Sequence, residues 1–245
     1  MPQDQKVLYE ENEVSVITFN RPEKLNALDE ESWRLLGDFI RKANSSHSKA
    51  IVITGKGRAF SSGDDIRAML QLKGQEDAVG FFDSLLYAVE GMIQTEKPII
   101  AAVNGLAYGG GCEILLFMDV VIAVKSATFS IPEGKLGLIP PMAITAGVRG
   151  LGRAVSWLAL TGDVVDSLRA RELGLVDIVV EEDQLQSEVQ RTLEKLSRID
   201  PNSIKVMKKW IRRNSQDVRD AIRELTLLSL SSEAKRRMEK FFSTS

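Results

Sequence analysis

Cysteine and histidine are almost absent from this chain, which has one of each among 245 residues. A single cysteine, Cys112, excludes an intrachain disulfide and a cysteine-rich zinc site. The single histidine, His47, lies in the polar stretch ANSSHS (residues 43–48), which is typical of an exposed loop. An enzyme with this sequence must therefore draw its acid–base chemistry from carboxylates, Lys, Tyr or Cys.

Long apolar runs and a strong net charge are also missing. The longest apolar candidate, residues 114–124, is interrupted by Asp119 and falls short of the roughly 18 residues of a membrane span. The first residues lack the basic-then-apolar pattern of a signal peptide. With 32 Lys and Arg against 34 Asp and Glu, the net charge of −2 indicates neither nucleic acid nor an anionic membrane as partner. We therefore expect a soluble, cytoplasmic globular protein.

Short apolar segments rich in β-branched residues alternate with helical periodicity over most of the chain. The predicted buried strands are residues 14–19, 50–54, 99–103, 120–124 and 176–180. The predicted helices between them are residues 29–43, 76–96 and 112–118. This alternation indicates an α/β fold with both faces of the sheet covered. From about residue 182 only helical periodicity remains, which predicts a helical tail.

The tail is basic, because residues 201–245 hold eleven Lys and Arg against five Asp and Glu. Helical spacing places five basic residues on one face of one helix: Lys205, Lys208, Lys209, Arg212 and Arg213. Two interpretations fit. The face is solvated, as charged faces usually are, or it contacts an anionic ligand or an acidic neighbouring subunit.

Two glycine-rich turns that follow predicted strands indicate chemistry. Neither fits a phosphate loop, a dinucleotide-binding motif or a nucleophile elbow. They are AFSSGDDI (residues 59–66) and NGLAYGGGCE (residues 104–113). Glycine lets backbone N–H groups approach a ligand closely, and two converging amides form an oxyanion hole. Glu113 falls in the first turn of the following helix, where a carboxylate could also simply complement the helix dipole.

Four segments together resemble the enoyl-CoA hydratase/isomerase (crotonase) family. They are NRPEKLNAL (residues 20–28), the two glycine turns and FSIPE (residues 129–133), in the order and spacing of that family. Similar stretches at residues 160–163, 170–176 and 231–242 extend the resemblance over nearly the whole chain. It implies a crotonase-like spiral of ββα units with an acyl-CoA site in residues 1–190. Residues 191–245 would be a helical trimerisation region, in homotrimers or dimers of trimers.

The resemblance also implies a set of site residues. The oxyanion-hole amides would be those of Asp64 and Gly110. Glu133 would protonate C2 of the acyl group, and Glu113 would be the partner of the water. Coenzyme A would lie along six residues: Lys24, Leu25, Ala27, Ser62, Asp65 and Ile66. No metal and no separate cofactor are expected, because coenzyme A is part of the substrate.

Two positions depart from the usual pattern of that family. Asp64 replaces a small or apolar residue, and its carboxylate disfavours a developing negative charge unless it points away. Pro141, expected at the substrate, stands where relatives often have a glycine amide that holds the catalytic water, and proline has no N–H.

Three hypotheses remain open. The first is hydration of a 2-enoyl-CoA to a 3-hydroxyacyl-CoA through a thioester enolate. The second is another crotonase-family acyl-CoA reaction, most simply Δ3–Δ2 isomerisation, which needs no water and fits a drier pocket lined by Met142 and Ile144. The third is a non-catalytic protein that binds acyl-CoA, or binds RNA through the basic tail.

Overall fold

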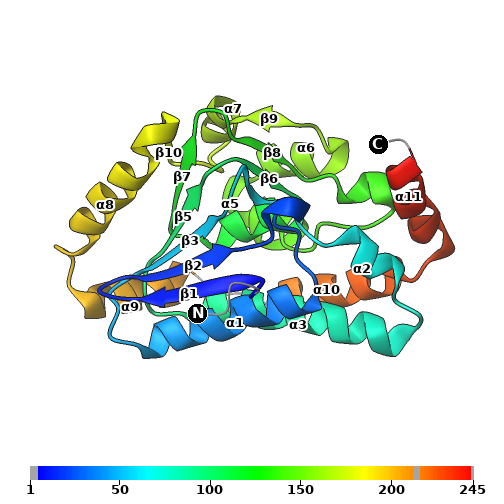
Figure 1. Cartoon of the computed structure of the whole chain (residues 1–245), viewed down its shortest axis with the longest axis horizontal. Helices are drawn as coiled ribbons and strands as arrows, with labels where there is room; N and C mark the ends of the chain where they lie inside the picture. The colour runs from blue at the N-terminus through cyan, green and yellow to red at the C-terminus, as the bar shows by residue number, and fades with distance from the viewer. Residues whose placement is uncertain (1–4, 212–215, 244–245) are drawn as a thin grey trace.

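The computed structural model describes residues 5–211 and 216–243. Two sheets form the centre of the molecule, with helices on both sides (Figure 1). The predicted α/β fold with a helical tail is confirmed. Among the described helices, none is long and apolar enough to cross a membrane.

The larger sheet has six strands, and five of them run parallel. Its spatial order is β1 (Val7–Glu11), β2 (Ser15–Phe19), β3 (Ile51–Gly55), β5 (Ile99–Val103), β7 (Val120–Val124) and β10 (Ile178–Val180). Only β1 is antiparallel, to β2. The central strand β5 is buried along its whole length, which explains why its sequence is continuously apolar rather than alternating.

The smaller sheet consists of four short strands. Its order is β4 (Ala59–Ser61), β6 (Leu106–Tyr108), β8 (Thr128–Ser130) and β9 (Val165–Asp166). The strands β4, β6 and β8 each follow a strand of the larger sheet after a short turn, and they pair in parallel with one another. This repeated change of sheet produces the spiral. At one such turn a Cβ on Gly105 would lie 2.1 Å from the carbonyl oxygen of Arg58, so only glycine fits there.

Helices follow the strand pairs and cover the sheets. The helices before the tail are α1 (Glu30–Ser45), α2 (Ile66–Leu70), α3 (Gln75–Gln94), α4 (Gly110–Glu113), α5 (Val148–Leu151), α6 (Arg153–Thr161) and α7 (Ser167–Glu172). The side chain of Asp29 accepts the Ser32 amide and caps α1, as its position predicted. Helix α1 buries Trp33, Leu36 and Ile40 in the core.

Short 3-10 and π turns join these elements: η1 (Pro22–Lys24), η2 (Ile114–Phe117), η3 (Glu133–Leu136), η4 (Ala143–Gly147) and η5 (Glu182–Gln184). The prediction of one apolar helix over residues 112–118 was wrong. This segment is the single turn α4 followed by the 3-10 turn η2, because the chain must straighten at Met118 to enter β7.

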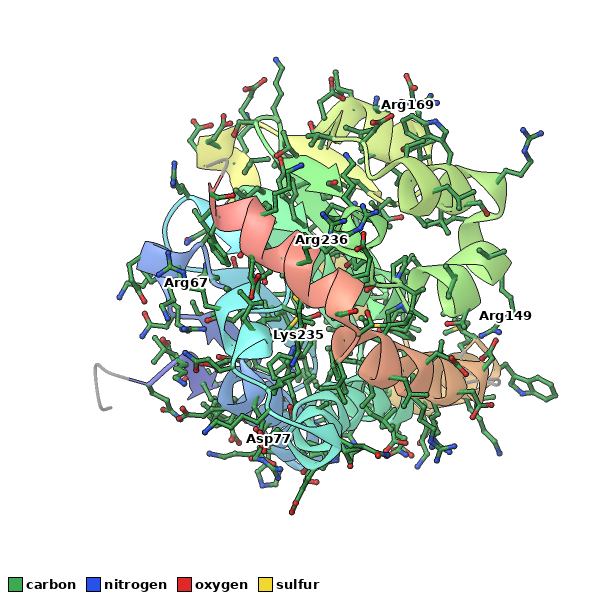
Figure 2. The ribbon with its side chains drawn as sticks, turned by 90° about the vertical axis from the view of Figure 1, so that its right-hand side faces the viewer. Arg67, Asp77, Arg149, Arg169, Lys235 and Arg236 are labelled. Carbon is green, nitrogen blue, oxygen red and sulfur yellow. The ribbon has the colours of Figure 1, made fainter. Side chains whose placement is uncertain are left out.

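The tail consists of four helices: α8 (Leu185–Leu196), α9 (Pro201–Ile211), α10 (Gln216–Ser229) and α11 (Ser232–Ser243). Helix α10 packs on α3, where Arg219 forms an ion pair with Glu90 at 2.6 Å. Helix α11 crosses the face seen in Figure 2 and contacts both α2 and η3. Lys235 Nζ on α11 donates to the Leu72 carbonyl just beyond α2 at 3.1 Å (Figure 2).

The basic face of α9 is not simply solvated, and its described contacts are with acidic residues of the same chain. Lys208 is buried and forms an ion pair with Asp119, and Lys205 pairs with Glu96 at 2.8 Å. Asp119 also accepts the Ile99 amide at the amino end of β5. Lys209 is exposed, whereas Arg212 and Arg213 lie outside the described residues. An external anion at Lys208 is therefore excluded, because its buried charge is matched by Asp119. For the exposed Lys205 and Lys209, contact with an anionic ligand or a neighbouring subunit stays a prediction.

Candidate active site

The two glycine turns of the sequence meet directly in the fold. Gly63, at φ +85°, lies two residues after the end of β4, and Gly109, at φ +51°, directly precedes α4. A Cβ on Gly63 would lie 2.7 Å from the Tyr108 carbonyl oxygen and 2.8 Å from the Gly110 nitrogen. Both the backbone conformation and this close approach require glycine at position 63.

The amides of Asp64 and Gly110 flank this contact and remain free. Three neighbouring amides are used: Gly63 N–H donates to Ser61 Oγ, Asp65 N–H to Leu28 O and Gly109 N–H to Ser130 O. In the described part of the chain, neither Asp64 N–H nor Gly110 N–H donates a hydrogen bond. Two free amides on adjoining turns are the donors that an oxyanion hole requires.

Glu113 is buried at the end of α4, and the turn after Pro141 holds its carboxylate. Its Oε1 accepts the amides of Met142 at 2.9 Å and Ala143 at 2.8 Å. Burial and the charge of Glu133 raise the pKa of Glu113, and the two amides oppose this rise. Pro141 itself has no N–H, so both donors to Glu113 come from the two residues that follow it, Met142 and Ala143.

Glu133 begins η3 and faces the second glycine turn. Its Oε1 lies 3.0 Å from the position of a Cβ on Gly109, and its buried Oε2 has no hydrogen-bond partner among the described residues. Burial raises the pKa of Glu133 to about 8, and the charge of Asp64 adds to the rise. Glu133 is therefore a neutral carboxylic acid near pH 7, with one oxygen free to give a proton.

Asp64 does not point away from these two glutamates. Its Oδ1 accepts the indole N–H of the fully buried Trp33 at 2.8 Å. Burial is the main reason why the pKa of Asp64 rises to about 6, with the Asp65 charge adding and the Trp33 hydrogen bond opposing. Because its charge also raises the pKa of both Glu113 and Glu133, the site contains three interacting carboxyl groups. Trp33 was not identified from sequence, since on a helical apolar stripe it looks like any core residue.

The six residues expected along coenzyme A lie together beside the first glycine turn. Ser62 N–H donates to Leu25 O at 3.0 Å, and the Leu28 amide donates to Gly63 O. Lys24 is exposed, and Leu25, Ala27, Ser62 and Ile66 are half-buried.

Asp65 differs from the other five because its carboxylate is already engaged within the chain. Its Oδ1 caps α2 by accepting the Arg67 and Ala68 amides, and its Oδ2 pairs with Arg21 at 3.0 Å. Its clearest contribution is to fix the glycine turn relative to α2.

Cys112 lies between the glycines and Glu113 but is completely buried. Burial, with the charges of Glu133 and Glu113, raises its pKa well above that of a free thiol. A thiol in this state is not a nucleophile. Within the described residues, no group of three or more His, Cys, Asp and Glu side chains is arranged to hold a metal ion.

A cavity of about 1180 Å³ lies elsewhere, between the larger sheet and α8. Its apolar wall includes Val14, Val16, Val189 and Leu193. Asp64, Glu113, Glu133 and the glycines at positions 63 and 109–111 do not line it, and of the second glycine turn only its first residue, Asn104, does. The chemistry indicated by the sequence is therefore at the glycine turns and not in this cavity.

Comparison with known proteins agrees with this fold and with the family that the sequence resembles. The profile of the Enoyl-CoA hydratase/isomerase family matches residues 9–240. A probable enoyl-CoA hydratase of Rhizobium meliloti is 37% identical over 187 residues, which are 75% of this chain and 72% of that protein. The short-chain-enoyl-CoA hydratase of Clostridium acetobutylicum is 34% identical over 216 residues, covering 86% and 82%.

A solved structure extends the likeness to three dimensions. The enoyl-CoA hydratase/isomerase of Pseudoalteromonas atlantica T6c superposes with a TM-score of 0.86 at 31% identity, covering 98% of this chain and 97% of that one. A fold of this kind with this site defines the crotonase class of proteins. The chain belongs to the enoyl-CoA hydratase/isomerase family.

Proposed function

We propose that this protein is an enoyl-CoA hydratase, which adds water reversibly and with syn geometry to a 2-enoyl-CoA to give a 3-hydroxyacyl-CoA. The observation that carries the proposal is the pair of buried glutamates, Glu113 and Glu133, beside two free amides on adjoining glycine turns. The names of the hydratase relatives support the same reaction.

The amides of Asp64 and Gly110 would bind the thioester oxygen. They withdraw electron density through the conjugated double bond, so that C3 becomes electrophilic and an enolate can form. A single oxyanion donor of this kind typically contributes about 10²–10³ in rate. Burial strengthens the effect, because the local dielectric is low.

The two glutamates would divide the proton transfers. Glu113, whose ionised form is favoured by two amides, takes a proton from water as the water oxygen bonds to C3. Glu133, neutral near pH 7, gives its proton to C2 as the enolate collapses. One proton is taken up and one is released, so the pair returns to its starting charge by proton exchange between the two carboxyl groups and solvent. The same steps in reverse dehydrate the product.

The substrate would enter as its coenzyme A ester, along Lys24, Leu25, Ala27, Ser62 and Ile66, with Asp65 holding the turn and Pro141 at the acyl group. No other cofactor takes part in these steps.

We further infer a cytoplasmic homotrimer or dimer of trimers that acts in fatty-acid metabolism. Exposed apolar residues support the oligomer, because Val206 and Ile211 on α9 and Leu227 on α10 are exposed to solvent in the described part of the chain.

Δ3–Δ2 isomerisation of an enoyl-CoA is the second candidate. It is favoured by Pro141, which offers no amide for a catalytic water, and by the engagement of the next two amides with Glu113. Isomerisation needs one carboxyl shuttle, and Glu133 with its free Oε2 meets that requirement.

Crotonyl-CoA turnover tests the proposal, followed as loss of the conjugated thioester absorbance. We expect fast loss with wild type and a 10²–10⁴-fold lower rate with Glu113→Gln and with Glu133→Gln. Glu188→Gln is the matched control, because Glu188 is equally buried but forms an ion pair with Arg191 on α8. Coenzyme A ester binding without turnover would refute hydration, and a 3-enoyl-CoA that becomes conjugated would establish the isomerase.

A further inference from the structure

One oxygen of Asp64 has a partner and the other has none. Oδ1 accepts the indole N–H of Trp33, which fixes the plane of the carboxyl group. Oδ2 lies 3.7 Å from the position of a Cβ on Gly110 and accepts no hydrogen bond from the described residues. The free oxygen therefore lies at the second glycine turn, where the acyl group of a bound thioester would begin.

No cation within residues 5–211 or 216–243 pairs with Asp64. The nearby Arg21 pairs with Asp65 at 3.0 Å and with Asp29 at 3.4 Å, and Lys24 is 3.7 Å from Asp65. No ion pair of the described residues includes Asp64. Its carboxyl group is thus partly buried and without a counter-ion among the described residues, beside two further carboxyl groups.

A second unsatisfied oxygen faces the same turn. Oε2 of Glu133 is buried without a partner, while its Oε1 adjoins Gly109, the neighbour of Gly110. A purely alkyl acyl chain would remove the remaining water from Asp64 Oδ2 and replace it with nothing. A hydroxyl group on the chain would restore the lost hydrogen bond. Sites built around a buried acceptor discriminate strongly against analogues that lack the matching donor.

We propose that Asp64 is a specificity-determining residue, whose Oδ2 accepts a hydrogen bond from a hydroxyl group on the acyl chain just beyond the reacting carbons. The preferred substrates are hydroxy-substituted 2-enoyl-CoA thioesters rather than simple alkyl ones. This inference rests on the proposed function and specifies its substrate class.

Two isosteric substrate pairs test it. The first pair is 4-hydroxybut-2-enoyl-CoA and pent-2-enoyl-CoA, and the second is 5-hydroxypent-2-enoyl-CoA and hex-2-enoyl-CoA. Within each pair a hydroxyl replaces a methyl group, so size is matched. We expect wild type to show at least a tenfold higher kcat/KM for the hydroxy member of one pair. A preference for the alkyl member in both pairs, or none, would overturn the proposal.

Variants assign the preference to the hydrogen bond. In Asp64→Ala we expect the ratio of kcat/KM for the hydroxy substrate to kcat/KM for its alkyl counterpart to fall to about two or less, because the acceptor is lost. Asp64→Asn retains an acceptor oxygen and should keep a clearly higher ratio than Asp64→Ala. Each ratio is measured on one preparation, so a partly folded variant does not distort it. Equal ratios in the two variants would attribute the effect to loop shape and overturn the proposal.

Binding separates this proposal from the proposed function. Calorimetry measures the affinity of the protein for 4-hydroxybutyryl-CoA and for pentanoyl-CoA. Neither ester has the double bond that reacts, so the measurement tests the contact with Asp64 without turnover. Tighter binding of the hydroxy ester by wild type, lost in Asp64→Ala, would support the role of Asp64 even if no hydration occurs. Equal binding together with active hydration would refute this inference alone.

Discussion

The backbone amide of Ala143 donates a 2.8 Å hydrogen bond to Oε1 of Glu113, thirty residues earlier in the chain. With the Met142 amide, it connects the turn after Pro141 to the end of α4. These two donors favour the ionised form of Glu113 and so oppose the rise in its pKa that burial and the charge of Glu133 cause. The turn that lacks the expected glycine therefore stabilises the group proposed to activate water.

Gly63→Ala should damage both the fold and the site. Its φ of +85° disfavours a side chain, and the new Cβ would lie 2.8 Å from Gly110 N. We expect a loss of about 1–3 kcal/mol in unfolding free energy and at least about a 100-fold lower kcat/KM for crotonyl-CoA, since one oxyanion donor moves. Gly150→Ala is the control, because nothing lies within 4 Å of its Cβ. Denaturant melts measure the unfolding free energy of both variants, and steady-state kinetics measure their kcat/KM for crotonyl-CoA. Full activity in Gly63→Ala would contradict the prediction.

Glu133→Gln should be more stable than wild type at alkaline pH. The folded-state pKa of Glu133, about 8, lies above its ordinary value of 4.5, so the folded protein keeps a proton that the unfolded chain has lost. Stability therefore falls as pH rises from about 4.5 to 8, by roughly 2–5 kcal/mol. Glutamine removes this dependence. We expect its Tm to exceed that of wild type by several degrees at pH 9 and to match it near pH 4.

The pH-dependent gain should be specific to the unpaired carboxyl group. Glu188→Gln removes an equally buried glutamate that is paired with Arg191, and it should not gain stability at pH 9. Parallel thermal melts at pH 4, 7 and 9 make the comparison. A Tm difference for Glu133→Gln that does not change with pH would show that Glu133 is not desolvated as described.

Lys208→Met should be strongly destabilising, whereas Lys205→Met should be nearly neutral. Lys208 is buried in an ion pair with Asp119, and breaking a buried pair by removing one partner costs about 3–5 kcal/mol. The Lys205–Glu96 pair is about half exposed on both sides and contributes about 0–1 kcal/mol. Urea melts measure both. Neither variant should change the KM for an acyl-CoA, and a raised KM in Lys205→Met would restore α9 as a coenzyme A contact.

Cys112 should resist thiol reagents in the folded protein. It is completely buried, and its pKa is raised well above that of a free thiol. We expect a disulfide reagent at pH 8 to modify the native protein only at the rate of local or global opening, and the urea-unfolded chain within minutes. As the single cysteine, it reports opening of the site directly. Rapid modification of the native protein would show that the glycine turn is accessible.

The long elements and the motif residues could be predicted from local sequence. The strands β3, β5 and β7 were predicted, at residues 50–54, 99–103 and 120–124, because a strand buried on both faces is continuously apolar. The strands β4, β6 and β8 were not predicted, since three residues show no period. They exist because they pair with one another, as Ala107 does with Phe129.

The site likewise has features that local sequence predicts and features that depend on tertiary contacts. Glu113, Glu133 and the glycines were recognisable because their spacing along the chain is characteristic, whereas the contacts that set their chemistry are not local. Trp33 meets Asp64 across 31 positions, and Lys208 meets Asp119 across 89. Local sequence was therefore sufficient for the α/β class and the helical tail, and it named the groups that we propose to be reactive. Only the tertiary structure decided which oxygens are buried, paired or free, because burial and pairing depend on neighbours that the spiral brings together.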